Sequence, residues 1–145
     1  MSRLLLRTLL VTLFTLLVAC SSNTDSSSDI EKLRGQWVVI NYWAKWCKPC
    51  IKEIPELNEL NQHYSEVTVV GVNYDGATGE SLAAQIEQLG IEFAILSQDP
   101  AGELQQPRPV VLPTSIILDP TGKVSQILLG PQTLASLAKA TQQSI

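Results

Sequence analysis

Hydrophobic and polar positions along the chain predict an alternation of strands and helices. Residues 36–44, 67–73 and 114–118 are apolar runs rich in β-branched and aromatic side chains, which is typical of strands buried on both faces. The sequence Asp-Pro-Thr-Gly at 119–122 is a turn signal. Residues 123–129 are therefore predicted to return from this turn as the second strand of a hairpin.

Three other segments have helical periodicity. The clearest is 49–64, where apolar residues recur every three or four positions. A second helix is predicted over 80–89, with Gly90 as its stop signal, and a third over 131–143, with Pro131 suited to its first turn. The apolar stripe of the first helix comprises Ile51, Ile54, Leu57, Leu60 and Tyr64.

The resulting order is β-α-β-α, followed by a hairpin and a terminal helix. A β-α-β unit implies parallel strands and a right-handed crossover, whereas the strands of a hairpin are antiparallel. The length of 145 residues provides material for one ordinary domain. A net charge of −4 and the absence of a basic cluster argue against a nucleic acid as a partner.

The first 19 residues have the pattern of a secretory signal peptide. Arg3 and Arg7 precede an apolar run over 8–18. This run is shorter than the roughly 20 residues that a helix needs to span a bilayer. We therefore predict that residues 1–19 direct the chain out of the cytoplasm.

The end of this run, Leu17-Val18-Ala19-Cys20, resembles the lipobox of bacterial lipoproteins. The resemblance implies cleavage before Cys20 and acylation of that residue. Residues 20–29 would then be the lipidated cysteine with a flexible serine-rich tether, and residues 30–145 the folded domain, held on the periplasmic side of the cell envelope. Ser21, where inner-membrane lipoproteins carry an aspartate, favours the outer membrane. The alternative is an uncleaved membrane anchor in which Cys20 has no role.

Two cysteines lie two residues apart where the first strand gives way to the first helix. Such a dithiol can close and reopen, and a helix N-terminus stabilises a thiolate. Cys47 is predicted to be the exposed nucleophile and Cys50, one turn further along, the resolving thiol. The pair also fits half of a zinc site, but the only histidine is His63, and four-coordinate zinc needs further ligands.

The motif Trp-Ala-x-Trp-Cys-x-x-Cys at 43–50, together with Leu-Pro-Thr at 112–114, resembles the thioredoxin superfamily. The resemblance extends from about residue 30 to the C-terminus. It implies an α/β thioredoxin fold with a central mixed β-sheet flanked by helices. Residues 39–55, 70–74 and 112–124 resemble most closely the membrane-tethered, extracytoplasmic TlpA-like oxidoreductases, which include the reductases of cytochrome c maturation.

This resemblance assigns a role to each residue of the motifs. Cys47 matches the attacking cysteine and Cys50 the resolving one. Pro113 matches a proline that is cis in the family and faces the dithiol. The backbone of Leu112 would pair with an extended substrate segment, and Trp46 would offer it an apolar contact surface.

Glu53 has two interpretations. It lies three residues after Cys50 and hence on the same helical face. The resemblance implies a partly buried carboxylate that exchanges a proton with Cys50, because Asn41 occupies the place where cytosolic thioredoxins carry a buried aspartate. The alternative is a solvated carboxylate paired with a lysine.

The function implied is reduction of periplasmic protein disulfides without a cofactor or metal. The partners would be protein thiols and disulfides, and a reductase would need an inner-membrane electron donor. A peroxiredoxin-like peroxide reductase is one alternative, although Ile40 and Ala44 replace the proline and the threonine or serine of its motif. A non-catalytic or metal-handling binding module is the other.

Overall fold

The computed structural model describes residues 29–144. The predicted signal peptide, Cys20 and residues 20–28 of the predicted tether lie outside the described residues. The predicted folded domain, residues 30–145, lies within the described residues except for its last residue.

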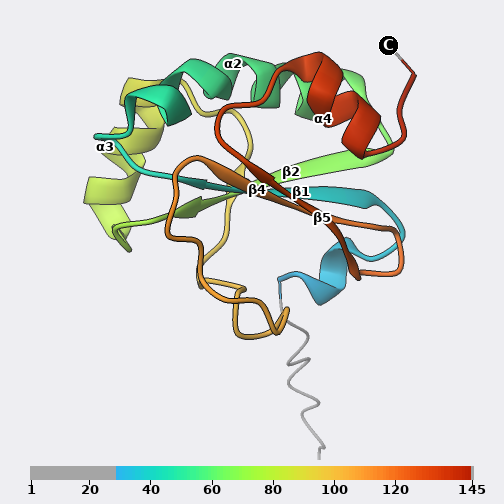
Figure 1. Cartoon of the computed structure of the whole chain (residues 1–145). Helices are drawn as coiled ribbons and strands as arrows, with labels where there is room; N and C mark the ends of the chain where they lie inside the picture. Colours follow the sequence, from blue (N-terminus) through green and yellow to red (C-terminus); the bar gives the residue numbers. More distant parts are fainter. Residues whose placement is uncertain (1–28, 145) are drawn as a thin grey trace, which may run out of the picture.

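The described elements follow the predicted order. The short helix η1 (Glu31–Leu33) leads into β1 (Trp37–Trp43), and Figure 1 shows the sheet with its helices. The sheet has the strand order β3-β2-β1-β4-β5. Strand β1 is parallel to β2 and antiparallel to β4, so the predicted mixed sheet is confirmed. The remaining elements are α2 (Lys48–His63), β2 (Val67–Asn73), α3 (Gly79–Leu89), β3 (Ala94–Ile95), β4 (Thr114–Leu118), β5 (Val124–Leu129) and α4 (Leu134–Ala140).

Each face of the sheet carries its own apolar cluster. On one face α2 and α4 lie side by side, and α3 adds partly buried leucine and isoleucine side chains (Figure 1). This cluster contains Trp43, Leu57, Leu137 and both cysteines of the dithiol. The opposite face is covered by η1 and by the irregular segment 97–111. The dithiol thus belongs to the helical face of the sheet.

The C-terminal helix is shorter than predicted. Helix α4 begins after Thr133, whose side chain accepts a hydrogen bond from the backbone N–H of Ser136, while the Ser136 hydroxyl accepts one from the Thr133 N–H. This capping box satisfies two N–H groups that would otherwise lack partners and starts the helix there, so Pro131 lies in the preceding connection. At the other end, Gln142 has a positive φ of 57°, which stops the helix.

The edge strand β3 lies within the short apolar segment 93–96. Ala94 pairs with Val70, and Ile95 pairs with Gly71. A Cβ atom on Gly71 would lie 2.6 Å from the Ile95 side chain and 2.8 Å from Trp43 Nε1. Glycine at this position therefore lets β3 and the Trp43 ring approach the second strand closely.

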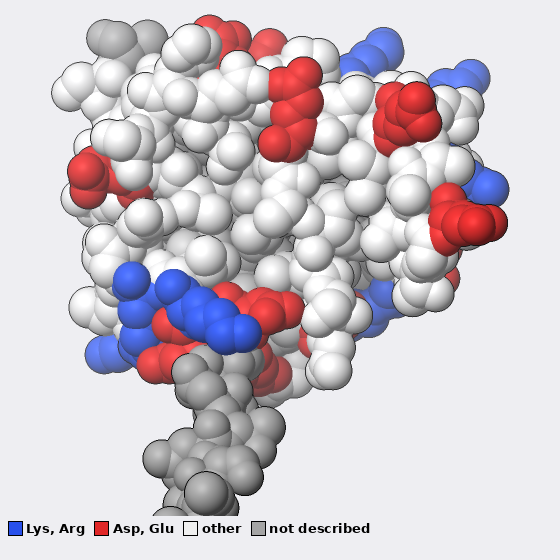
Figure 2. Space-filling model, turned by 180° about the vertical axis from the view of Figure 1, so that it is seen from behind, with Lys and Arg blue, Asp and Glu red and all other residues white. Residues whose placement is uncertain are grey.

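Charges of both signs are mixed on the face shown in Figure 2. Lysine and arginine lie among acidic side chains near the beginning of the described chain. Two ion pairs in this region are Lys32–Asp29 at 3.4 Å and Arg34–Glu31 at 2.5 Å. Such exposed pairs contribute at most about 1 kcal/mol each to stability.

Across residues 29–144, the helices are all too short or too polar to cross a lipid bilayer.

Candidate active site

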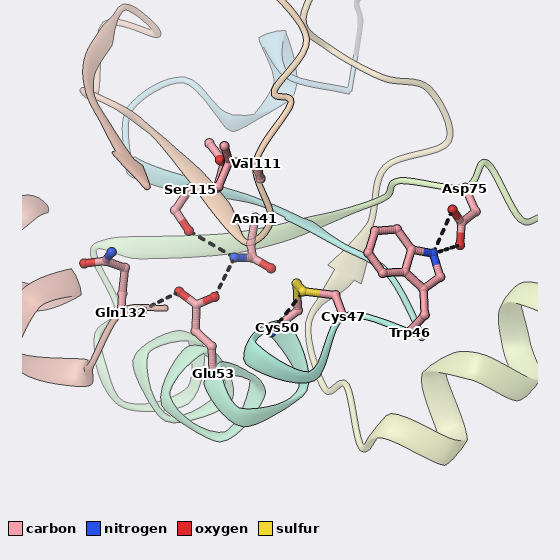
Figure 3. The surroundings of a disulfide bond; sticks show 10 residues. Asn41, Trp46, Cys47, Cys50, Glu53, Asp75, Val111, Ser115 and Gln132 are labelled. Carbon is pink, nitrogen blue, oxygen red and sulfur yellow. Dashed lines mark hydrogen bonds between the residues drawn. A yellow bond between two sulfur atoms is a disulfide. The ribbon is translucent and has the colours of Figure 1, made fainter. Parts of the chain in front are cut away.

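The two cysteines of the motif are joined by a disulfide at the start of α2. Their Cα atoms are 5.3 Å apart and the S–S distance is 2.04 Å. After β1 the chain turns, with the N–H of Cys47 donating to the carbonyl of Ala44 at 3.0 Å. Cys47 is then the N-cap of α2, and its Sγ accepts a hydrogen bond from the Cys50 N–H at 3.3 Å (Figure 3). The helix dipole and these N–H groups favour a thiolate at Cys47 once the bond is reduced.

The predicted exposure of Cys47 is wrong for the disulfide form. Cys47 is 4% exposed and Cys50 is 1% exposed. Both belong to the buried cluster on the helical face, against which Leu112 also packs. The position of Cys47 at the start of a helix does not predict this burial, because it depends on packing in the folded chain.

The Leu112–Pro113 peptide bond is cis, in agreement with the position of Pro113 in the motif. Strand β4 begins at Thr114, which pairs with Tyr42 near the end of β1. This register brings Leu112 and Pro113 to the end of the sheet from which the Cys47 turn departs. The carbonyl of Pro113 accepts a hydrogen bond from Gly130 at 2.9 Å. Pro113 is buried and Leu112 is half-buried.

Trp46 lies on the opposite side of the disulfide from Glu53 (Figure 3). Its side chain is 60% exposed, which makes it one of the large apolar groups at the surface. The indole Nε1 donates to the carboxylate of Asp75, at 3.0 Å to Oδ2 and 3.2 Å to Oδ1. Asp75 follows β2 and fixes the orientation of the ring. Sequence reasoning did not single out this partner.

Glu53 is buried, so its interpretation as a solvated carboxylate paired with a lysine is wrong. Its exposure is 1%. The Nδ2 group of Asn41 donates to Oε2 at 3.2 Å, and the backbone N–H of Gln132 donates to Oε1 at 3.0 Å (Figure 3). Asn41 also donates to the Ser115 hydroxyl at 3.0 Å. Strand β1 and the connection before α4 thus meet at the carboxyl group of Glu53 on α2, and β4 is linked to it through Asn41.

This environment changes the acidity of Glu53. Burial raises the pKa of the Glu53 carboxyl to about 7, although the hydrogen bonds from Gln132 and Asn41 act in the opposite direction. A carboxyl with this pKa exchanges its proton near neutral pH. Cys50 lies one turn before Glu53 on the same face of α2, and both side chains are buried.

No group of three or more His, Cys, Asp or Glu side chains within residues 29–144 is arranged to hold a metal ion. Ile40 and Ala44, at the positions that a peroxiredoxin-like motif requires for its proline and hydroxyl residue, are both 0% exposed. Position 44 thus places a methyl group, and no hydroxyl, three residues before Cys47.

Comparison with known proteins decides the family. The AhpC/TSA family model matches residues 12–127. The chain belongs to the AhpC/TSA family. This places it in the thioredoxin superfamily, as its motifs predicted.

Two relatives and one solved structure illustrate the similarity. The thiol-disulfide oxidoreductase ResA of Bacillus thuringiensis subsp. konkukian is 35% identical over 112 residues, which are 75% of this chain and 64% of that protein. ResA of Oceanobacillus iheyensis is 32% identical over 122 residues, or 81% of this chain and 62% of that protein. The chain therefore spans less than two thirds of these relatives. A DsbF homologue from Corynebacterium diphtheriae has a TM-score of 0.62 at 27% identity, covering 78% of this chain and 74% of that one.

Proposed function

We propose that this chain is a thiol–disulfide oxidoreductase that reduces disulfides of extracytoplasmic proteins. The observation that carries the proposal is the closed Cys47–Cys50 disulfide at the N-terminus of α2, beside the cis Leu112–Pro113 bond. The names of the ResA relatives, thiol-disulfide oxidoreductases, support the same chemistry.

The reaction begins from the reduced dithiol. The Cys47 thiolate attacks one sulfur of the substrate disulfide, the substrate S–S bond breaks, and one substrate thiolate leaves. A mixed disulfide joins Cys47 to the substrate. Cys50 then gives its proton to the Glu53 carboxylate and attacks the Cys47 sulfur, which breaks the mixed disulfide and releases the second substrate thiolate. Two electrons pass to the substrate, and the chain is left with the disulfide seen here.

Substrate would be held on both sides of the dithiol. In our proposal the backbone of Leu112, beside Pro113, pairs with an extended substrate segment, as in other cases of strand addition. The exposed Trp46 ring, fixed by Asp75, supplies an apolar contact. Both groups lie where β1 ends and β4 begins, next to the disulfide.

The peroxide-reductase alternative is less well supported. The peroxiredoxin-like motif places a hydroxyl residue at position 44, and the buried methyl group of Ala44 offers no hydrogen bond. The closed Cys47–Cys50 bond fits two-thiol exchange directly. The metal-handling alternative would need ligands beyond this pair. A non-catalytic module would not need both cysteines.

We also propose that the chain is a lipoprotein anchored through Cys20 and facing the periplasm, with the outer membrane favoured by Ser21. Oxidised protein would then be re-reduced by an inner-membrane electron donor. Metabolic labelling with a palmitate analogue tests the anchor. Wild-type protein should be labelled and membrane-bound, and Cys20→Ala should be unlabelled. Equal labelling of both proteins would exclude this anchor.

Trapping in the native host tests the function. The Cys50→Ser variant retains the attacking thiol but cannot resolve the mixed disulfide, so it should accumulate covalent complexes with its clients. These complexes should disappear on reduction and should be absent from the Cys47→Ser/Cys50→Ser double variant. Apocytochrome c among the trapped proteins would support a role in cytochrome c maturation. Recovery of the same background from both variants would contradict the exchange function.

A further inference from the structure

The segment that precedes the cis proline presents two apolar side chains to solvent. Residues 98–111 contain neither helix nor strand and connect β3 to Leu112 and Pro113. Val110 is 91% exposed and Val111 is 48% exposed. We name these two residues the valine shelf. Because this segment has no helix or strand, other contacts must fix its backbone if the two valine side chains are to stay in one place at the surface.

Arg108 provides such contacts at the start of the shelf. Its Nε donates to Asp99 Oδ2 at 2.8 Å, and its Nη2 donates to the carbonyl oxygen of Tyr74 at 2.6 Å. The guanidinium also lies over the Tyr74 ring, with Cζ 3.9 Å from the ring centroid. Tyr74 in turn donates its N–H to the carbonyl of Trp43 at 2.8 Å. Arg108 thereby ties the segment to the end of β1.

Asp99 holds the other side of the guanidinium. Its Oδ1 accepts hydrogen bonds from the buried Tyr42 hydroxyl at 2.7 Å and from the Ala101 N–H at 3.0 Å. Burial alone would raise the pKa of Asp99, but the hydrogen bonds from Ala101, Tyr42 and Arg108 outweigh it and lower the pKa. The carboxylate therefore stays ionised at neutral pH and keeps its pair with Arg108. Lysine would not reproduce this planar, two-sided contact.

The connection that follows β2 contacts both Trp46 and Arg108. Asp75 fixes Trp46 beside the disulfide, and the adjacent Tyr74 binds Arg108. A cavity of about 270 Å³ lies between the shelf and the two hairpin strands, β4 and β5. Its apolar lining includes Pro109, Ile116, Ile127 and Leu129. The shelf is continuous in sequence with Leu112, where we place the substrate backbone.

We propose that Arg108 is a positioning residue that determines specificity for protein disulfides over small disulfides. By fixing the valine shelf, it places an apolar surface against a hydrophobic side chain of the polypeptide that carries the substrate disulfide. A small disulfide reaches Cys47 without touching the shelf. This inference rests on the proposed function.

Single turnovers of the pre-reduced protein test the inference, with insulin as the protein probe and glutathione disulfide as the small probe. For Arg108→Gln, the half-saturating insulin concentration should rise roughly five- to tenfold while the limiting rate stays unchanged. The rate with glutathione disulfide should stay within about twofold of wild type. The half-saturating insulin concentration of Arg108→Lys should lie between those of wild type and Arg108→Gln. Arg34→Gln, which removes an exposed arginine from the opposite end of β1, is the matched control.

Val110→Ser provides a second test that does not depend on the folding of the Arg108 variants, because Val110 is almost fully exposed. It should weaken insulin binding in the same way. If Arg108 acts through the shelf, the Arg108→Gln/Val110→Ser double variant should lose no more affinity for insulin than the weaker-binding of the two single variants. Three results would overturn the inference. The fold-losses of affinity in the single variants could multiply in the double variant, the half-saturating insulin concentration could stay unchanged, or the losses could be equal with insulin and glutathione disulfide. If wild-type protein reduces neither probe, the proposed function itself fails.

Discussion

Replacing Cys47 with serine is expected to lower the rate of disulfide exchange with insulin by at least about a thousandfold. A hydroxyl at the N-cap of α2 would receive the same N–H groups and the same helix dipole, but it supplies no thiolate at neutral pH. The measurement is the single-turnover reduction of insulin, followed by quantifying the free thiols of the substrate. Circular dichroism should show that the Cys47→Ser variant is folded like wild type, so that the loss of activity is not due to unfolding.

The matched control is Cys50→Ser. This variant keeps the attacking thiol, so its first step should stay within about tenfold of wild type, while the second substrate thiol is not released. If Cys47→Ser retained the first step and Cys50→Ser lost it, the order of attack proposed here would be reversed.

Replacing Glu53 with glutamine is expected to slow resolution of the mixed disulfide by about a hundredfold, because the inner thiol loses its proton acceptor. In wild-type protein the resolution rate should rise with pH through an inflection near 7, where the buried carboxyl loses its proton. In Glu53→Gln this inflection should vanish. The measurement is the decay of the mixed disulfide in acid-quenched samples over a range of pH.

Glu56→Gln is the control for this prediction. Glu56 lies one turn further along α2 and accepts a hydrogen bond from the Leu134 N–H at 2.6 Å, much as Glu53 accepts one from Gln132. Like Glu53, it holds the chain near the start of α4 to α2, but it does not lie next to Cys50. Equal slowing in both variants would assign Glu53 to anchoring of the α4 connection alone and would contradict its role in proton transfer.

The same carboxyl links stability to pH. Its pKa in the folded protein is raised to about 7 from an ordinary value of 4.5, so the folded state retains a proton that the unfolded state has lost. The contribution of this carboxyl to the free energy of unfolding is therefore fully present below about pH 4.5. It is lost as the pH rises through about 7, and its size is on the order of 3 kcal/mol. The measurement is the free energy of unfolding by urea over a range of pH. In Glu53→Gln this decrease between about pH 4.5 and 7 should be absent.

The order of elements and the dithiol could be predicted from the sequence because they depend on local information. Apolar runs marked the strands, a helical period marked α2, and the Cys-x-x-Cys spacing marked the redox pair. The C-terminal helix was predicted too long, because the capping box at Thr133 sets its start more strongly than the preceding Pro131 does.

The surroundings of the dithiol could not be predicted in the same way, because they depend on tertiary contacts. Ser115 lies 74 positions from Asn41, and Gln132 lies 79 positions from Glu53. The Gln132 contact uses a backbone N–H, so no residue type signals it. Cys47 is likewise buried in a cluster against which Leu112, a residue far along the chain, also packs. These contacts follow from the sheet order, which brings β4 against β1.

The most direct test of the account is to locate the covalent bond to the substrate. Reduced Cys47→Ser and Cys50→Ser variants would be mixed with insulin, quenched with acid and digested, and the joined peptides identified by mass spectrometry. The account predicts an adduct through Cys47 in the Cys50→Ser variant and little or none in the Cys47→Ser variant. An adduct through Cys50 alone, or none in either variant, would contradict it.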